Sequence, residues 1–296
     1  MAKEIKGIGV PLITPFHADE SINDAAVRVM VKYMLDNGVH GLFAAGSTGE
    51  SYVLSLDEKK QVMNIVLEAN NGRAWTMMGT GTITTKDSIK ETKWAESAGV
   101  DTVSVITPYF IGPSDDELVD HYVAICESTS LPVYAYNNPP RTNLPLKPAV
   151  MAAVAKRCPN LKGIKDSSGD LSNAMGYIQQ CPPGFAVFMG RDSIVYPALV
   201  AGCVGAVAAT ANVVPDLVVG IYNAWLAGDG AKALELQAKL TPLRNAFTWT
   251  TFPQIMKDAL NLMGYPAGIC RGPIKGIAGA RKEQLAALLR NMGYLK

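Results

Sequence analysis

The sequence has no long hydrophobic run and no excess of charge of either sign. No segment offers the roughly 18 uncharged apolar residues of a membrane-spanning helix, and the amino terminus lacks the continuous apolar stretch of a secretion signal. Lysine and arginine number 27 against 26 aspartate and glutamate, so there is no basic surface of the kind that nucleic acids select. We therefore expect a cytoplasmic protein whose partner is a small molecule, with no nucleic acid and no membrane as partner.

Cysteine and histidine are also scarce. The cysteines are odd in number, widely spread and without CxxC spacing, which favours buried thiols in a reducing compartment over a disulfide framework. The histidines are isolated, so no metal site can be assembled from local sequence, and we interpret each of them as structural or surface-exposed. These residues are Cys126, Cys158, Cys181, Cys203, Cys270, His17, His40 and His121.

The sequence does contain a regular alternation of short β-branched runs with longer amphipathic ones. This pattern is typical of a parallel sheet wrapped by helices. Strands are expected at residues 7–16, 41–45, 75–79, 102–107, 133–136, 163–165, 186–189 and 205–209. Helices are expected at residues 24–37, 57–70, 86–97, 115–127, 147–157, 171–180, 193–201 and 215–226.

Eight repeats of strand and helix predict an α/β fold, the closed (β/α)8 TIM barrel. An open dinucleotide-binding sheet is disfavoured because the first turn, residues 15–20, has no GxGxxG sequence. Three further helical patterns without intervening strands follow at 231–245, where Pro242 could produce a kink, 253–263 and 282–292. We predict a barrel over residues 1–228 and a C-terminal three-helix extension, residues 229–296, packed on it.

Lys165 stands where a short apolar run stops, within Leu161-Lys162-Gly163-Ile164-Lys165-Asp166. An ammonium group held against apolar walls loses hydration, which favours the neutral amine that attacks carbonyl carbon. This chemistry would suit a Schiff-base lysine. The alternative is a lysine that reaches from a strand end to a surface carboxylate, and this window alone favours that alternative.

Other candidate residues follow the expected second and fifth strands. Gly46-Ser47-Thr48-Gly49-Glu50 has small residues whose amides and hydroxyls could hold a carboxylate, although a plain glycine turn is the more frequent explanation. Tyr136 could move protons or simply fill the mouth of the barrel. Arg141, after a proline turn, could hold a carboxylate by two parallel hydrogen bonds or be merely solvated.

Together these windows resemble the dihydrodipicolinate synthase and N-acetylneuraminate lyase family of class I aldolases and lyases. The resemblance runs from Gly7 to the C-terminal helices. Its most specific pieces are Gly46-Ser47-Thr48-Gly49-Glu50, Thr107-Pro108-Tyr109, Tyr136-Asn137-x-Pro139 and Gly163-Ile164-Lys165-Asp166. It implies a (β/α)8 barrel with a helical tail, a homotetramer built as a dimer of dimers, no metal, and pyruvate bound as a Schiff base without another cofactor.

The resemblance also implies roles for individual residues. Lys165 becomes the imine lysine and Tyr136 the proton carrier. Ser47 and Thr48 become the cradle for the pyruvate carboxylate, and Ser47 also stands where the family has a proton-relaying hydroxyl. An iminium on Lys165 would act as an electron sink, so that the adjacent carbon can be deprotonated or its bond to a leaving aldehyde cleaved. Substrate contacts are further expected from Gly190, Arg191 and Asp192, which follow the seventh strand.

Several positions depart from one or the other branch of the family. Arg141 matches the synthases, in which this arginine binds the carboxylate of the second substrate, aspartate semialdehyde. Phe110 does not match them, because synthases have a tyrosine there that relays protons across the dimer interface. Arg191 and Asp192 replace the paired acidic residues of the sialic acid lyases, and Ala209 replaces a serine. We infer an acceptor that is shorter and more anionic than a sugar acid, with Arg141 and Arg191 as its anchors.

Three hypotheses remain. The first is a pyruvate-dependent synthase whose second substrate is a small aldehyde bearing a carboxylate, with the dihydrodipicolinate synthase reaction as the best single interpretation. The second uses the same imine in an N-acetylneuraminate lyase-like or 2-keto-3-deoxy acid aldolase, dehydratase or deaminase reaction. The third is a catalytically silent barrel with a binding or regulatory role. Feedback by lysine is expected to be absent, because Leu56, Lys59 and Ile83 occupy the regulatory positions.

Overall fold

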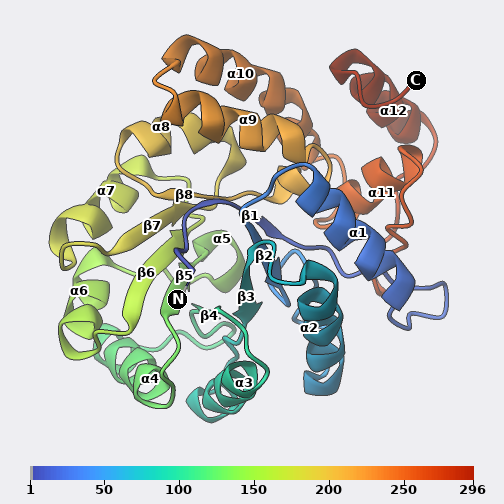
Figure 1. Ribbon diagram of the computed structural model, residues 1–296. Helices are drawn as coiled ribbons and strands as arrows, with labels where there is room; N and C mark the ends of the chain where they lie inside the picture. The colour runs from blue at the N-terminus through green and yellow to red at the C-terminus, as the bar shows by residue number, and fades with distance from the viewer. Residues whose placement is uncertain (1–2) are drawn as a thin grey trace. The chain divides into compact units, whose positions relative to one another are not determined.

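A computed structural model describes residues 3–296, and its eight strands form one closed parallel barrel in sequence order (Figure 1). The predicted TIM barrel is confirmed. The strands are β1 (Gly7–Pro11), β2 (Gly41–Ala44), β3 (Trp75–Gly79), β4 (Thr102–Ile106), β5 (Val133–Asn137), β6 (Leu161–Asp166), β7 (Ala186–Met189) and β8 (Gly205–Val207).

Helices follow the strands as the sequence pattern predicts, and several begin with strong capping signals. Ser55 with Glu58, and Ser114 with Glu117, form reciprocal capping boxes. The helices are α1 (Asp24–Asp36), α2 (Leu56–Asn70), α3 (Thr85–Ser97), α4 (Asp115–Glu127), α5 (Pro139–Thr142), α6 (Pro148–Arg157), α7 (Leu171–Gln180), α8 (Val195–Val200), α9 (Pro215–Leu226), α10 (Gly230–Ala246), α11 (Gln254–Leu262) and α12 (Ala280–Met292). Two 3-10 turns, η1 (Asp192–Ile194) and η2 (Ala209–Asn212), complete the order.

The first strand is shorter than predicted. It ends at Pro11, whereas the sequence suggested a strand as far as Phe16. Pro11 and Pro15 have no backbone N–H to donate to a sheet, so this apolar run cannot continue as a regular strand. Phe16 instead makes isolated antiparallel bridges with Ile22 and Ile269.

Two further differences concern helices. The short helix α5, residues 139–142, was not predicted, because the sequence Pro139-Pro140 is typical of a turn. Proline is nevertheless well suited to the first positions of a helix, where its missing N–H is not needed. Helix α10 is continuous from Gly230 to Ala246 with Pro242 inside it.

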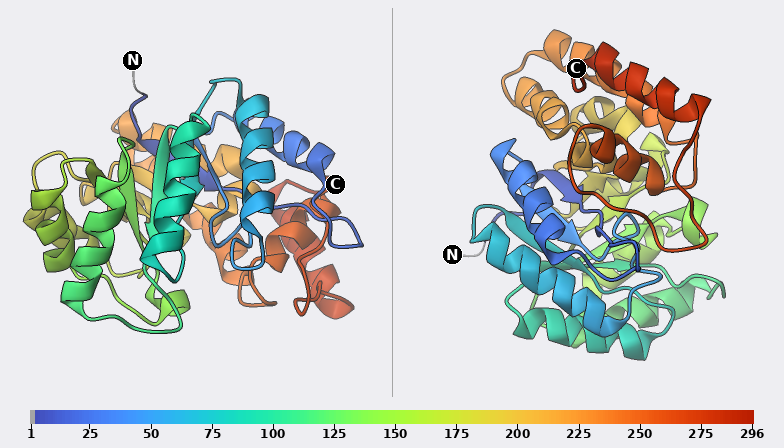
Figure 2. Two further views of the ribbon diagram at one scale, coloured as in Figure 1. Left: turned by 90° about the horizontal axis from the view of Figure 1, so that it is seen from below. Right: turned by 90° about the vertical axis from the view of Figure 1, so that its right-hand side faces the viewer.

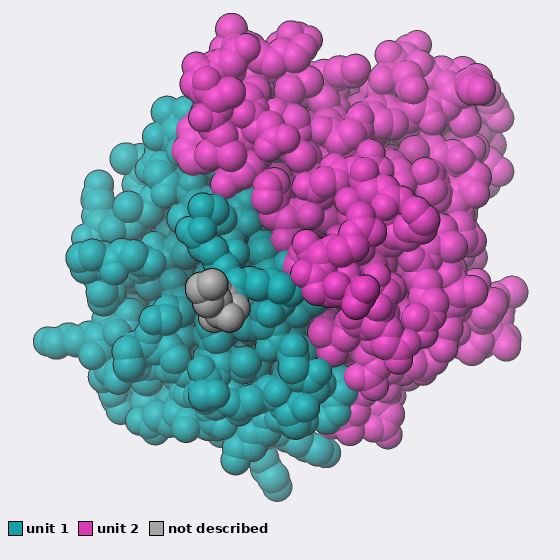
Figure 3. Space-filling model, viewed as in Figure 1, with its two compact units in different colours: residues 1–7, 75–207 teal, residues 8–74, 208–296 magenta. Residues whose placement is uncertain are grey.

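The chain divides into two compact units (Figure 3). One combines the segment that ends at Gly7 with residues 75–207, and the other combines residues 8–74 with 208–296. In the second unit α1 packs against α2, α10 packs on α9, and α12 contacts α10 and α11 (Figure 2). The predicted extension, residues 229–296, therefore supplies helices to a larger packed unit, while its status as a separate domain stays a prediction.

Aromatic side chains fill the interior of the first unit. Phe188 on β7 meets Trp75 on β3 and Tyr134 on β5 edge to face, with ring centroids 6.0 and 5.8 Å apart. All three are buried and come from alternate strands, as the packed layers of such barrels require. The five cysteines are buried and unpaired, in line with the expectation of buried thiols. Among residues 3–296, no helix combines the length and the apolar character needed to cross a membrane.

Candidate active site

Lys165 and Tyr136 are direct neighbours on the paired strands β6 and β5. Residues opposite each other in a sheet present their side chains to the same face. The Lys165 Nζ atom accordingly lies 4.2 Å from the centroid of the Tyr136 ring. Both residues are only 5% exposed. The structure therefore brings the predicted imine lysine and the predicted proton carrier together in a buried place at the carboxyl ends of their strands.

The Tyr136 hydroxyl is oriented by the loop that follows it. The Asn138 side-chain amide donates a hydrogen bond of 2.8 Å to the Tyr136 hydroxyl oxygen. Asn138 is buried and precedes α5, and its carbonyl accepts from the backbone N–H groups of Arg141 and Thr142. This hydrogen bond fixes the phenol oxygen of Tyr136 relative to the loop that follows β5.

Asp166, the residue after Lys165, anchors the turn that leaves β6. Its carboxylate accepts from the Asn137 amide at 2.8 Å, from the Ser168 N–H at 3.0 Å and hydroxyl at 2.9 Å, and from the Asn173 amide at 3.1 Å. The side chain is fully buried. The sequence interpretation gave Asp166 no role, although an aspartate inside a buried strand end is itself a signal that hydrogen-bond donors converge there.

Asn137 extends this network toward the next helix. Its amide nitrogen donates to Asp166, and its amide oxygen accepts from the Leu146 N–H at 2.9 Å. Its backbone carbonyl accepts from the Ser167 N–H at 2.8 Å. The ends of β5 and β6 are thus tied together directly after the Lys165 and Tyr136 pair.

Arg141 lies on α5 and its side chain is exposed. Pro139 and Pro140 fix the start of this short helix, which sets the direction in which the Arg141 side chain leaves the loop. The arginine thus comes from the loop that follows the Tyr136 strand. Its predicted role as a carboxylate anchor stays a prediction.

In the loop after β7, Gly190 lies close to the turn after β6, and the next two side chains differ in exposure. The Gly190 N–H donates to the Asp166 carbonyl at 2.7 Å, and a Cβ at Gly190 would lie only 2.0 Å from the Ser167 hydroxyl oxygen. Any larger residue at this position would force the Ser167 side chain to move. Arg191 is exposed, with its side chain lying along Gly169, whereas Asp192 is buried at the start of η1. The substrate contacts expected of all three residues stay predictions.

The loop after β2, residues 46–50, belongs to the second unit. Two non-glycine residues have positive φ here, Ala45 just before the loop at 52° and Glu50 at its end at 57°. The Glu50 N–H donates to the Ser47 carbonyl at 3.3 Å. Thr48 is buried and Ser47 is partly exposed. This tight bend presents backbone amides and two hydroxyls within three residues, which is the chemistry of a carboxylate cradle.

The residues expected at the dimer interface and at the regulatory positions differ in burial. Phe110 is 92% exposed and has a φ of 76°. The preceding Tyr109 is partly buried, and burial raises the pKa of its phenol. Of the residues at the expected regulatory positions, Lys59 is buried and Ile83 is exposed.

Comparison with known proteins decides the family. The Dihydrodipicolinate synthetase family model matches residues 4–292. The chain belongs to this family. The prediction of a lyase or synthase is confirmed with it.

Two curated relatives are named 4-hydroxy-tetrahydrodipicolinate synthase. The one from Methanopyrus kandleri is 36% identical over 100% of this chain and 99% of the relative. The one from Acidiphilium cryptum is 36% identical over 97% of this chain and 98% of the relative. Both relatives match along nearly their whole length.

Solved structures agree. A dihydrodipicolinate synthase from Thermotoga maritima has a TM-score of 0.94 at 32% identity and covers 98% of this chain and 99% of its own. A chloride-inhibited dihydrodipicolinate synthase from Acinetobacter baumannii, solved with pyruvate, has a TM-score of 0.95 at 30% identity and covers 99% of this chain and 100% of its own. The fold of this chain therefore matches that of solved synthases over 98 to 99% of its length.

Proposed function

We propose that this protein is a 4-hydroxy-tetrahydrodipicolinate synthase that binds pyruvate as a Schiff base on Lys165. The observation that carries this proposal is the buried pair of Lys165 and Tyr136, with the amine 4.2 Å from the phenol ring. An amine, a nearby phenol and a water-poor setting are the groups that imine chemistry requires. The names of the full-length relatives support the same reaction.

The proposed reaction begins with attack of the neutral Lys165 amine on the pyruvate carbonyl carbon. Loss of water gives an iminium, and removal of a methyl proton converts it to an enamine. The enamine carbon then forms a bond with the aldehyde carbon of the second substrate, whose oxygen takes a proton. Tyr136 carries these protons, and its hydroxyl is held in place by Asn138.

Ser47 and Thr48 hold the pyruvate carboxylate in this proposal, and Ser47 also relays protons. Their loop follows β2, and Lys165 and Tyr136 lie at the ends of β6 and β5, so each group lies at the carboxyl end of a barrel strand. This is where (β/α)8 enzymes hold their active sites. The iminium itself is the electron sink, so the reaction as proposed uses neither a metal nor a redox cofactor.

The second substrate is proposed to be a short aldehyde with a carboxylate. Arg141 is an exposed cation on the loop that follows the Tyr136 strand, and a guanidinium suits bidentate binding of a carboxylate. Arg191 is a second exposed cation, on the loop after β7, with Gly190 and Asp192 beside it. Charge of this sign favours an anionic acceptor over a neutral sugar chain.

The residue at position 110 favours a second candidate reaction, that of an aldolase or dehydratase. Phe110 stands where the synthase branch has a tyrosine, and a phenyl ring cannot relay protons. The same imine would then serve an aldolase or dehydratase reaction on a 2-keto-3-deoxy acid. A catalytically silent barrel is disfavoured, because Lys165 and Tyr136 keep the paired, buried arrangement that catalysis needs.

We also infer a homotetramer built as a dimer of dimers, located in the cytoplasm. Phe110 and the adjacent Ile111 are 92% and 65% exposed, and this pair of neighbouring apolar side chains supports a subunit contact that would cover them. Five unpaired cysteines support a reducing compartment. Sedimentation equilibrium of the wild type, and of Phe110→Ala as a variant of the contact, checks the assembly.

Incubation with pyruvate and borohydride tests the central step. Reduction of the iminium should leave a stable adduct whose mass is located on Lys165 by peptide mapping. An adduct on another lysine, or none, rejects the mechanism. Product analysis with aspartate semialdehyde and with a panel of deoxy acids then separates the synthase from the aldolase and dehydratase reactions.

Arg141→Ala tests the nature of the second substrate. Loss of a charge-assisted bidentate contact costs about 1.5 to 3 kcal/mol, so kcat/KM for a carboxylated aldehyde should fall about 10- to 200-fold. Imine formation with pyruvate should be unchanged, and Arg141→Lys should recover only part of the loss. An equal fall for the carboxylated aldehyde and its uncharged analogue would show that the arginine is structural.

A further inference from the structure

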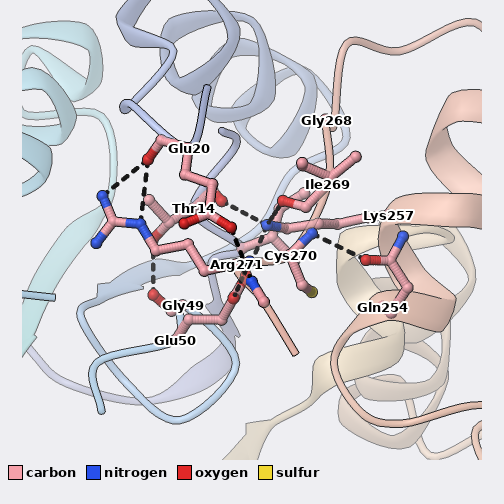
Figure 4. Close-up of polar contacts among 12 residues, drawn as sticks. Thr14, Glu20, Gly49, Glu50, Gln254, Lys257, Gly268, Ile269, Cys270 and Arg271 are labelled. Carbon is pink, nitrogen blue, oxygen red and sulfur yellow. Dashed lines mark hydrogen bonds and ion pairs between the residues drawn. The ribbon is translucent and has the colours of Figure 1, made fainter. Parts of the chain in front are cut away.

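The second unit contains a fully buried ion pair that joins the loop after β2 to the C-terminal helices (Figure 4). The Lys257 Nζ atom on α11 lies 2.6 Å from a carboxylate oxygen of Glu50. Both side chains are 0% exposed. Lys257 Nζ also donates to the carbonyl oxygens of Thr14 at 2.7 Å and Ile269 at 2.5 Å. Each of the three ammonium hydrogens therefore has an acceptor.

Burying this ion pair costs desolvation free energy that apolar side chains at the same place would not cost. Burial lowers the pKa of the Lys257 ammonium, while the Glu50 carboxylate acts in the opposite direction. Two apolar side chains of the same volume are often as stabilising as a buried ion pair, because the charges must first be desolvated. A role in fixing the position of one segment relative to another explains the pair better than stability alone.

The segment that the pair fixes contains Ser47 and Thr48. Glu50 ends the tight bend after β2, in which the Ser51 N–H also donates to the Gly46 carbonyl at 3.2 Å. A carboxylate held at Glu50 therefore sets where the whole bend lies.

Thr14 holds the same bend from the other side. Its carbonyl accepts from Lys257, and its hydroxyl donates to the Gly49 carbonyl at 2.8 Å (Figure 4). A Cβ at Gly49 would lie 2.9 Å from the Leu12 carbonyl, so the loop backbone rests directly on the segment after β1. Lys257 thus reaches the bend by two routes, through Glu50 and through Thr14.

A second cation from the C-terminal part completes this cluster. The Arg271 backbone N–H donates to the other Glu50 carboxylate oxygen at 3.1 Å. Its guanidinium donates to the Val53 carbonyl at 2.9 Å and to the Glu20 carbonyl, so it also holds the segments on each side. The Phe16 ring has both cations near its faces, with Lys257 Nζ and Arg271 Cζ each 4.5 Å from its centroid.

We propose that Lys257 is a positioning residue for the pyruvate carboxylate cradle, so that the C-terminal helices set the affinity of the enzyme for the 2-oxo acid. The inference rests on the proposed function, because it presupposes that Ser47 and Thr48 bind pyruvate. Lys257 does not touch the substrate. It holds Glu50 and Thr14, and these two residues hold the bend.

The test uses Lys257→Met, which keeps most of the side-chain volume and removes the charge. The pyruvate concentration that half-saturates borohydride trapping, and KM for pyruvate, should both rise about 10-fold or more. KM for the second substrate and kcat should change less than about threefold. Glu50→Gln/Lys257→Met should recover part of the pyruvate affinity, because a neutral amide no longer needs a cation beside it. If Lys257→Met does not fold, Glu50→Gln alone should still raise half-saturation at least about threefold.

Leu289→Ala is the matched control, since Leu289 is a fully buried residue of α12 whose truncation destabilises the same unit. It should leave pyruvate half-saturation unchanged. An equal rise in this variant, or no rise in Lys257→Met while the wild type forms its Lys165 adduct, overturns the positioning role and leaves the proposed function intact. Absence of the Lys165 adduct in the wild type overturns both.

Discussion

The turn after β6 and the bend after β2 are each held by one buried carboxylate, but by different kinds of partner. Asp166 accepts from neutral groups, two side-chain amides and both the hydroxyl and N–H of Ser168. Glu50 accepts from the Lys257 ammonium and from the Arg271 backbone. The first anchor is therefore built of neutral dipoles, and the second contains a full opposite charge.

The difference matches what each segment is proposed to bind. The turn after β6 follows Lys165, whose neutral amine is the attacking form, and neutral donors hold the Asp166 carboxylate in that turn. The bend after β2 is proposed to receive an anion on Ser47 and Thr48. A carboxylate at Glu50 would repel that anion if Lys257 did not neutralise it. The Lys257 ammonium thus reduces the electrostatic repulsion between Glu50 and an anion bound at Ser47 and Thr48.

Removal of the neutral anchor should have the largest effect. Asp166→Ala leaves the buried Asn137 amide and the partly buried donors of Ser168 and Asn173 without their acceptor. An unsatisfied buried donor costs about 1 to 3 kcal/mol and the partly buried ones cost less, so the free energy of unfolding should fall by about 3 kcal/mol. The rate of borohydride trapping should also fall steeply, because Lys165 adjoins the released turn. Urea titration and trapping kinetics measure the two effects.

Asp101→Ala is the control for this prediction. Asp101 accepts from the Thr76 N–H at 2.8 Å and hydroxyl at 2.9 Å, but it precedes β4 and so lies at the opposite end of the strands. Its loss should lower stability and leave trapping kinetics unchanged. If Asp166→Ala and Asp101→Ala slow trapping equally, Asp166 has no special relation to Lys165.

The two anchors also differ in how far the sequence could predict them. The strand ends that carry Tyr136 and Lys165 were predictable because short apolar runs stop there. Their proximity was predictable because sequential strands usually pair, as β5 and β6 do. Asp166 finds its partners at most 29 residues away. Lys257 lies 207 residues from Glu50, on an amphipathic helix where a lysine usually faces water. Only the folded structure shows that this lysine is buried.

Loss of the Tyr136 hydroxyl should have a smaller effect than loss of Asp166, and on turnover only. Tyr136→Phe keeps the ring beside Lys165, so imine formation should remain measurable while turnover falls about 10²-fold or more, the scale of a lost acid–base group. Tyr134→Phe removes a hydroxyl two residues earlier on β5 and should leave turnover near wild type. Wild-type turnover in Tyr136→Phe would assign the proton transfers to another group.

The smallest effect is expected for Glu58. Its carboxylate accepts hydrogen bonds from the guanidinium of Arg271, the residue whose backbone N–H holds Glu50. The Arg271 hydrogen bonds, with help from the Ser55 N–H, lower the pKa of the Glu58 carboxyl from its ordinary value of 4.5 to about 2. Between these two values the unfolded chain takes up a proton that the folded chain does not. The stability from this contact should therefore be complete above about pH 5 and be lost as the pH falls toward 2.

Glu58→Gln should remove this acid-sensitive part of the stability. At neutral pH the loss should be about 1 kcal/mol or less, because Glu58 and Arg271 are partly exposed and solvent screens the pair. The unfolding midpoint in urea, followed from pH 7 to pH 3, should fall less steeply in the variant than in the wild type. Glu117→Gln is the matched control, since Glu117 closes a capping box of the same kind with Ser114 on α4. If both variants reduce the fall of the urea midpoint between pH 7 and pH 3 equally, the pH dependence comes from the capping boxes and the Arg271 contact contributes nothing to it.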